Sequence, residues 1–193
     1  AKDLALPQTS TAEEAAQILA TKKNIYFLTG AGLSAASGIP TFRGDGGLWT
    51  VRNQTEPVKA QDFLTYNYFK EHPEEIWRWH HLFMKTKSSH SPNISHYAIA
   101  ELQLFCIKNG IDFTLVTQNI DNYHIEALEK VSNKYKEVIP LSFLNPKHEK
   151  YGFYDECIEI HGNILYMRCD ENCTNQLYPS QKNVSDEYFV PCC

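Results

Sequence analysis

Apolar positions recur along this chain with spacings that alternate between those of helices and those of buried strands. A stretch over about 11–22 holds good helix formers and opens with serine or threonine followed by glutamate at capping-box spacing, so it predicts a first helix. The run Asn24–Leu28 is short, apolar and rich in residues that favour strands, which predicts a buried parallel strand. That strand leads directly into a glycine-containing turn at 30–32.

The same order of elements returns near the middle of the chain. Residues 92–106 carry apolar positions at a helical period, and Asn109-Gly110 is typical of a left-handed helix stop. Residues 112–116 predict the next strand. Alternating helices and strands indicate a parallel α/β sheet, whose ligand sites lie at the carboxyl ends of the strands. The segments 30–32 and 117–121 both follow such ends and are the first candidates for a binding site.

Two further segments interrupt this pattern. Residues 58–87 are rich in aromatic side chains and helical in period, with Pro73 opening the second of two predicted helices. Such an insert can cover a cofactor or line a groove, although most buried aromatic rings serve packing. Residues 131–156 are polar, aromatic and irregular, which indicates a surface insertion.

Composition narrows the class of protein. The chain has 193 residues, a net charge of -5 and 42% hydrophobic residues, enough for one full domain and a small appendage. Its basic residues form no run, so we expect no binding to nucleic acid. No stretch approaches the roughly 20 apolar residues of a membrane helix, and the first ten residues do not have the features of a signal peptide. We predict an intracellular protein; its start at Ala1 leaves the compartment open, and its oligomeric state is open too.

The turn Gly30-Ala31-Gly32, between a strand and a predicted helix, can present backbone N–H groups to a phosphate. By itself this is a weak signal, because an ordinary tight turn explains it as well. It also departs from the dinucleotide fingerprint G-x-G-x-x-G, since Ala35 stands at the position of the third glycine and no acidic residue follows a second strand about 20 residues on.

Three separated blocks change this interpretation. They are GAGLSAASGIPTFRG at 30–44, TQNID at 117–121 and EIHG at 159–162. In this order they closely resemble the signature of the sirtuins, the NAD-dependent protein deacylases, and the resemblance runs from about Asn24 to Cys173. In the insert it is nearest to the class whose best-known member removes succinyl and related acidic acyl groups.

The resemblance implies an α/β fold with a Rossmann-like parallel sheet, organised as an NAD-binding domain over 1–162 with a helical insert at about 58–90. The start of a small cysteine-containing module would follow at 163–193. In sirtuins the sheet then continues with strands that bind the adenosine half of NAD. We therefore expect this chain to carry only part of the sheet, with an exposed edge, and to be poorly stable and weakly active by itself.

The resemblance also assigns roles to residues of these blocks. Contacts to NAD are implied for Gly30, Ala31, Gly32, Ser34, Phe42, Arg43, Trp49, Gln118, Asn119, Ile120, Asp121 and His161. The glycine turn would cradle the pyrophosphate, while Phe42 and Arg43 would lie on a loop that folds over the cofactor. Asp121 would accept from the nicotinamide carboxamide. Catalysis is assigned to His161 and Asn119.

His161 would act as the general base that takes a proton from a ribose hydroxyl, a task suited to an imidazole near neutral pH. A lone histidine after a strand is more often structural, so this role depends on the other blocks. The predicted reaction transfers the acyl group of an acylated-lysine protein to ADP-ribose and releases nicotinamide. Two alternatives stay open: a module that binds NAD or ADP-ribose without turnover, and a protein ADP-ribosyltransferase.

Six cysteines crowd toward the C-terminus, a pattern that favours metal binding over a disulfide framework. In sirtuins a zinc module of two C-x-x-C pairs begins here, which makes Cys169, Cys173, Cys192 and Cys193 the candidate ligands. Both pairs depart from that pattern, because the first has three intervening residues and the second is adjacent, which would strain a tetrahedral site. Structural zinc and reduced cysteines without metal both stay open.

The region expected to contact the acyl group departs from the acidic-acyl class. When Trp77 and Pro92-Asn93 are aligned with that class, its carboxylate-gripping tyrosine and arginine fall on His80 and Phe83. A phenylalanine cannot replace a bidentate guanidinium. The resemblance and this departure together predict that neutral acyl groups, acetyl or longer, are preferred over succinyl. A protonated His80 is the one remaining candidate for weak recognition of an anion.

Overall fold

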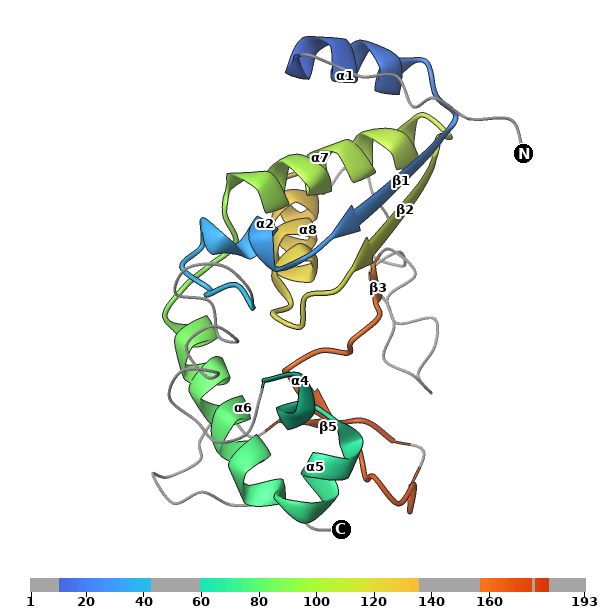
Figure 1. Ribbon diagram of the computed structural model, residues 1–193. Helices are drawn as coiled ribbons and strands as arrows, with labels where there is room; N and C mark the ends of the chain where they lie inside the picture. The colour runs from blue at the N-terminus through green and yellow to red at the C-terminus, as the bar shows by residue number, and fades with distance from the viewer. Residues whose placement is uncertain (1–10, 43–59, 136–156, 175, 181–193) are drawn as a thin grey trace, which may run out of the picture.

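Three parallel strands form the sheet at the centre of the molecule. The computed structural model describes residues 11–42, 60–135, 157–174 and 176–180. The strands lie side by side in the order β1 (Asn24–Thr29), β2 (Asp112–Thr117) and β3 (Ile158–Glu159) (Figure 1). Thr29 pairs with Thr117, and Thr117 pairs with Glu159, so the carboxyl ends of all three strands meet at one edge. The predicted parallel α/β sheet is confirmed.

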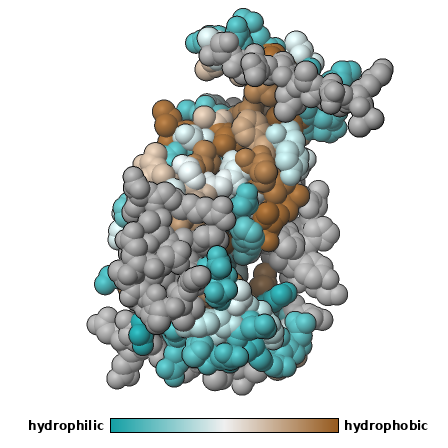
Figure 2. Space-filling view, in the orientation of Figure 1, coloured by the Kyte–Doolittle hydropathy of each residue, from teal (hydrophilic) through white to brown (hydrophobic). Residues whose placement is uncertain are grey.

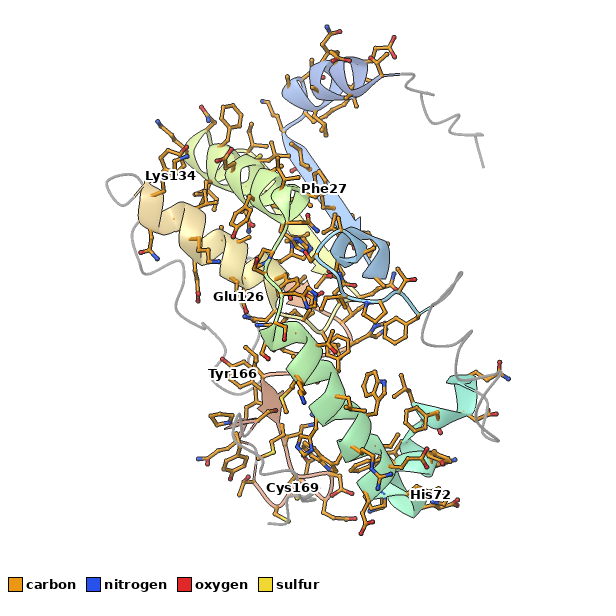
Figure 3. The ribbon with its side chains drawn as sticks, turned by 90° about the vertical axis from the view of Figure 1, so that its left-hand side faces the viewer. Phe27, His72, Glu126, Lys134, Tyr166 and Cys169 are labelled. Carbon is orange, nitrogen blue, oxygen red and sulfur yellow. The ribbon has the colours of Figure 1, made fainter. Side chains whose placement is uncertain are left out.

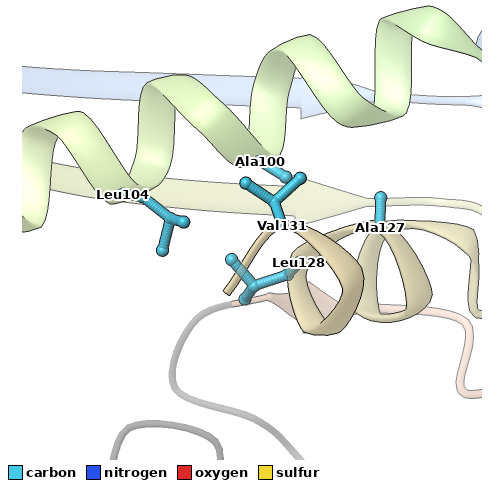
Figure 4. Packing of buried hydrophobic residues seen from close by; sticks show 5 residues of the cluster. All are labelled: Ala100, Leu104, Ala127, Leu128 and Val131. Atoms are coloured by element: carbon cyan, nitrogen blue, oxygen red, sulfur yellow. The ribbon is translucent and has the colours of Figure 1, made fainter. Parts of the chain in front are cut away.

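Two helices cover one face of this sheet, α7 (Ile94–Lys108) and α8 (Tyr123–Lys134). Between them lies a cluster of buried residues, shown in Figure 4: Ala100, Leu104, Ala127, Leu128 and Val131. A second buried cluster joins the same helices to β2 and to the residue just before β3: Ile99, Leu115, Ile125 and Cys157. Burial of this apolar surface holds the helices against the sheet and so fixes the loops at the strand ends.

The predicted helix over 92–106 is confirmed in α7, which Asn93 caps by accepting a hydrogen bond from the Ser95 N–H. The predicted left-handed stop is confirmed at Gly110, whose φ is +65°. The prediction of a surface insertion from 131 onward was wrong at its start, because Val131 is only 5% exposed and belongs to α8. Residues 136–156 lie outside the described part of the chain.

The opposite face of the sheet carries exposed apolar side chains (Figure 2). Strand residues alternate between the two faces, so Ile25 and Thr29 are buried toward the helices, while Tyr26 and Leu28 on β1 are exposed. Ile158 and Ile160 at β3 are exposed as well. Within the described residues, apolar packing therefore closes only one side of the sheet.

Within its described residues, 60–88, the helical insert contains three helices where two were predicted. They are α4 (Ala60–Phe63), α5 (Tyr66–Glu71) and α6 (Pro73–Ser88). Pro73 opens α6 as expected. Phe63 is fully buried and meets the Trp79 ring edge-on, with 6.4 Å between centroids. An ion pair between Lys87 and Glu126 ties the end of α6 to α8.

A small antiparallel pair of strands, β4 (Tyr166–Met167) and β5 (Tyr178–Pro179), lies beside the lower half of the insert (Figures 1 and 3). Lys70 of α5 forms ion pairs with Asp170 and Glu171 in the loop between these strands, at 2.9 and 2.6 Å. The insert and the cysteine-containing loop are therefore in direct contact.

The first helix, α1 (Ala12–Ala20), precedes β1 and confirms the helix predicted over about 11–22. Its capping box is complete, with Thr11 and Glu14 each accepting from the other's backbone N–H. No helix within the described ranges is long and apolar enough to cross a bilayer.

Candidate active site at the strand ends

The glycine turn connects β1 to a short helix, α2 (Ala31–Ala35). Gly30 is the N-cap of α2 and has an extended backbone, so its conformation does not itself require glycine. A Cβ at Gly32 would meet no atom within 4 Å, and the residue is exposed. The missing side chain therefore leaves room for a ligand to approach the backbone of the turn, as a bound phosphate requires.

The loop after β2 lies directly against this turn. The Asn119 side-chain amide donates to the Gly30 carbonyl and to Ser34 Oγ, both at 3.1 Å. Ser34 Oγ in turn donates to Asp121 Oδ2 at 2.6 Å, and the second oxygen of Asp121 accepts from the Tyr123 N–H at 3.0 Å. The hydrogen bonds between the two blocks join residues that are 85 to 89 positions apart in the sequence. They hold four residues of the predicted cofactor set in one buried network.

Two buried histidines support this network and were not among the predicted site residues. His96 Nδ1 accepts from the Asn93 N–H at 3.2 Å, so its proton is on Nε2, which faces Ser34 Oγ at 3.4 Å. His124 Nε2 lies 2.9 Å from Thr29 Oγ1, which donates to Thr117 Oγ1 at 2.9 Å, so Nε2 is the donor to Thr29. The one sequence signal for His96 is its helical spacing to the buried Ile99 and Ala100.

Burial keeps both histidines neutral. Desolvation lowers the pKa of His124 to about 3, and the neighbouring His96, with 5.1 Å between ring centroids, acts in the same direction. Desolvation also lowers the pKa of His96, against the opposing attraction of Asp121. The side chains that underlie the strand ends therefore carry no positive charge near pH 7.

His161 follows β3 and reaches across to the loop after β2. Its Nδ1 lies 2.9 Å from the Gln118 carbonyl oxygen, which can only accept, so Nδ1 carries the proton. The Nε2 atom then has a free lone pair, and the imidazole is exposed. The Ile164 N–H donates to the Ile120 carbonyl at 2.9 Å and joins the same two loops. This geometry suits a base that takes a proton from a bound ligand.

A pocket of about 500 Å³ opens beside His161. Its wall comes from the loop after β2, the segment 159–168, α6 and the approach to β5. The lining residues are His80, Ile120, Glu159, Ile160, His161, Gly162, Asn163, Ile164, Tyr166, Met167, Arg168 and Leu177. The pocket therefore brings a residue of the helical insert next to the proposed base.

Glu159 is a buried carboxyl group in this wall, two residues before His161. Asn163 Nδ2 donates to its two oxygens at 2.9 and 3.0 Å and to Asn122 Oδ1 at 2.7 Å. Desolvation nevertheless raises the pKa of Glu159 to about 7. Sequence reasoning did not assign this residue a role, although a charged residue between Ile158 and Ile160 was a visible signal.

A model of the Sir2 family matches residues 30–137, more than half of the chain. The chain belongs to the Sir2 family. This confirms the resemblance to the sirtuins and assigns the turn, the loop after β2 and α7 to the family's shared region.

Known relatives agree with this assignment. A Thermus thermophilus protein named NAD-dependent protein deacylase is 33% identical over 181 residues, which cover 94% of this chain and 58% of the relative. A Danio rerio protein named NAD-dependent protein deacylase sirtuin-5, mitochondrial, is 40% identical over 150 residues, covering 78% and 39%. The crystal structure of a Sir2 homologue with NAD superimposes with a TM-score of 0.62 at 28% identity, covering 91% of this chain and 54% of that one. The chain thus spans about half the length of these members of the Sir2 family.

Only one of the two residues predicted to contact the acyl group lines this pocket. His80 lines the pocket together with His161. Desolvation, with a smaller effect of His81, lowers the pKa of His80 to about 4, so it is neutral near pH 7. Phe83 stacks obliquely on Trp79, with 5.6 Å between centroids, and is not part of the pocket wall. Recognition of an anion by a protonated His80, the weak possibility left by the sequence, therefore has no support.

The candidate metal ligands are described only in part. Cys169 and Cys173 approach each other to 3.2 Å between sulfur atoms, so the wider C-x₃-C spacing still brings the two thiols together, as a Sir2 zinc module needs. Cys192 and Cys193 lie outside the described residues, as do Arg43 and Trp49. Across the ranges that are described, no group of three metal-binding side chains forms. Two thiols alone do not make a structural zinc site, and the zinc prediction stays a prediction.

Proposed function

We propose that the whole protein is an NAD-dependent protein lysine deacylase and that His161 is its general base. The observation that carries the proposal is the hydrogen bond from His161 Nδ1 to the Gln118 carbonyl oxygen at 2.9 Å, which leaves Nε2 free to accept a proton. The names of the Thermus thermophilus and Danio rerio relatives support the same activity.

The residues of the strand ends fit the proposed cofactor. The open backbone at Gly32 suits a pyrophosphate, and the buried network of Ser34, Asn119 and Asp121 offers an amide, a hydroxyl and a carboxylate to the ribose and carboxamide groups of NAD. When bound, NAD supplies the ADP-ribose that accepts the acyl group, with nicotinamide as the leaving group. Asn119 and Asp121 are orienting groups in this scheme, since each is fixed by a second hydrogen bond.

The proton-transfer step falls to His161. Its fixed tautomer presents Nε2 to the pocket, where a ribose hydroxyl can be deprotonated for attack on the acyl carbon. A module that merely bound NAD or ADP-ribose would have no need for an exposed imidazole held in one tautomer, which favours catalysis over binding without turnover. The proposed partner is a protein with an acylated lysine, and an intracellular location is part of the same proposal.

We also propose that neutral acyl groups are preferred over succinyl. Phe83 packs into the insert, and the half-buried His80 is held neutral, so neither side chain can pair with a carboxylate. Glu159 adds a carboxyl group to the same wall. The relative named sirtuin-5 belongs to the class for which the opposite preference is expected. The acyl preference is therefore the sharpest test of the roles proposed for His80 and Phe83.

The experiment is nicotinamide release from NAD by the full-length protein, with acetyl-, succinyl- and myristoyl-lysine peptides. We expect release that depends on an acylated peptide, with kcat/KM for acetyl above that for succinyl. His161→Ala should reduce release by at least a hundredfold, the lower end of the typical range for a general base of about 10²–10⁴. Release that survives this substitution would remove the mechanism. Release with transfer of ADP-ribose to protein would favour the transferase instead.

A further inference from the structure

Asn163 stands two residues after His161 and joins the segment that carries this base to the loop after β2. Its side-chain Nδ2 donates to Asn122 Oδ1 at 2.7 Å. The same nitrogen donates to the two carboxyl oxygens of Glu159, at 2.9 and 3.0 Å. An amide nitrogen carries two hydrogens, so one serves Asn122 and the other is shared by the oxygens of Glu159. One side chain therefore connects the end of β3 to the start of α8.

The orientation of both amides follows from partners that can only donate or only accept. The Leu165 N–H donates to Asn163 Oδ1 at 2.9 Å, so the Nδ2 atom of Asn163 points toward Glu159 and Asn122. Asn122 Nδ2 donates to Glu126 Oε1 at 3.3 Å, so its Oδ1 atom faces Asn163. Reversing either amide would set two like groups against each other. The link between the two asparagines is therefore specified from both ends.

The backbone on each side of this link is also fixed. Asn122 is the N-cap of α8 and has a φ of +65°, a left-handed conformation that asparagine and glycine adopt more readily than other residues. Glu159 is almost fully buried, and its carbonyl accepts from the Gly162 N–H at 3.0 Å. This bond closes the turn that presents His161. Asn163 thus anchors both the residue that begins the turn and the residue that begins α8.

We infer that Asn163 is a positioning residue, which fixes the turn carrying His161 against the loop after β2. The inference rests on the proposed function, in which His161 is the general base. A base must lie within hydrogen-bonding reach of the proton that it takes, and a misplacement of about 1 Å can cost about a hundredfold in rate. Asn163 lines the pocket, but its amide nitrogen and oxygen are both engaged by the protein. It therefore acts through His161 and not on the substrate.

The test measures nicotinamide release by the full-length protein at pH 8 with an acetyl-lysine peptide. Asn163→Asp keeps the shape of the side chain, removes both N–H donors and places a second carboxylate beside Glu159, which is ionised at pH 8 because its pKa is about 7. We expect kcat to fall by about tenfold or more, with the KM for NAD changed by less than about threefold. Asn109→Asp is the matched control, since it changes the charge equally at an exposed residue before β2, at the opposite end of the sheet. It should leave kcat unchanged.

The decisive measurement repeats Asn163→Asp in a His161→Ala background. If Asn163 acts through His161, its substitution should change the residual release there by less than about twofold, against about tenfold in the wild-type background. An equal loss in both backgrounds would mean that Asn163 only supports the fold, and it would overturn the inference. An unchanged kcat in the wild-type background would overturn it as well.

A second variant serves the same comparison if Asn163→Asp does not fold. Asn122→Gly removes the other end of the link, and glycine adopts the φ of +65° without strain. The expected loss and its dependence on His161 are the same, and a loss that is equal in both backgrounds would again contradict the inference. No release by the wild-type protein with any acyl peptide would instead remove the proposed function itself.

Discussion

The buried histidine beneath the strand ends predicts a measurable acid sensitivity. His124 is 5% exposed, and its pKa is about 3 in the folded protein against 6.5 for the ordinary side chain. Because the pKa of His124 is lower in the folded than in the unfolded protein, the contribution of its neutral ring to folding stability is complete above pH 6.5. This contribution is lost as the pH falls toward 3. Between pH 7 and pH 5, protonation of the unfolded chain at this one residue costs about 2 kcal/mol of folding stability.

The perturbation that isolates this effect is His124→Gln. A glutamine amide can still donate to Thr29 Oγ1 but does not titrate. We expect the free energy of unfolding of the wild-type protein to fall by about 2 kcal/mol more than that of the variant between pH 7 and pH 5. The comparison needs both proteins, because Glu159, whose pKa is raised, changes the wild-type stability in the opposite direction over part of this range.

The assay is urea unfolding of the full-length protein at several pH values, followed by tryptophan fluorescence. His72→Gln is the matched control, since this histidine is exposed at the junction of α5 and α6. Its stability curve should run parallel to that of the wild type. If the wild type and His124→Gln lose the same stability between pH 7 and pH 5, then His124 is not buried as a neutral ring and the reasoning is wrong.

Three further predictions concern the site and the core. Glu159→Gln should be more stable than wild type at pH 8 by up to about 3 kcal/mol, with little difference at pH 4.5. The reason is that the stability that Glu159 contributes in its protonated form is lost as the pH rises from 4.5 to 7. Urea unfolding at both pH values measures the difference, and equal stabilities of the two proteins at pH 8 would contradict the raised pKa. Ser34→Ala removes the hydroxyl that joins Asn119 to Asp121 and should raise the KM for NAD or lower kcat by at least tenfold at unchanged acyl preference, which steady-state kinetics would show. Leu128→Ala opens a cavity between α7 and α8 and should cost about 2–5 kcal/mol in urea unfolding, and a loss below 1 kcal/mol would mean that this cluster is not a packed core.

Local patterns were sufficient for the elements that border the site. Thr11 and Glu14 close a capping box within one turn, Pro73 opens α6, and Gly110 stops α7, since each depends on neighbours a few residues away. The end of α8 was misjudged because the polar residues near Val131 hide an apolar stripe that only the packed sheet reveals.

The site blocks were found by their resemblance to a family, while their mutual geometry was not predictable from the chain. Asn119 reaches Gly30 and Ser34 because parallel pairing of β1 with β2 brings together loops that are more than 80 residues apart. The neutral state of His124 depends on burial, which no local pattern reports.

The amino-acid sequence by itself determined the helices over about 11–22 and 92–106, the strands over 24–28 and 112–116, the glycine turn and the family signature. These features depend on residue type and local spacing. Tertiary structure alone decided which ring nitrogen of His161 carries the proton, since the Gln118 carbonyl that selects Nδ1 comes from the end of another strand. It also decided that Glu159, whose pKa burial raises to about 7, lines the same pocket as His161. Desolvation and hydrogen-bond partners arise only when distant segments pack together, and they set the chemistry of this site.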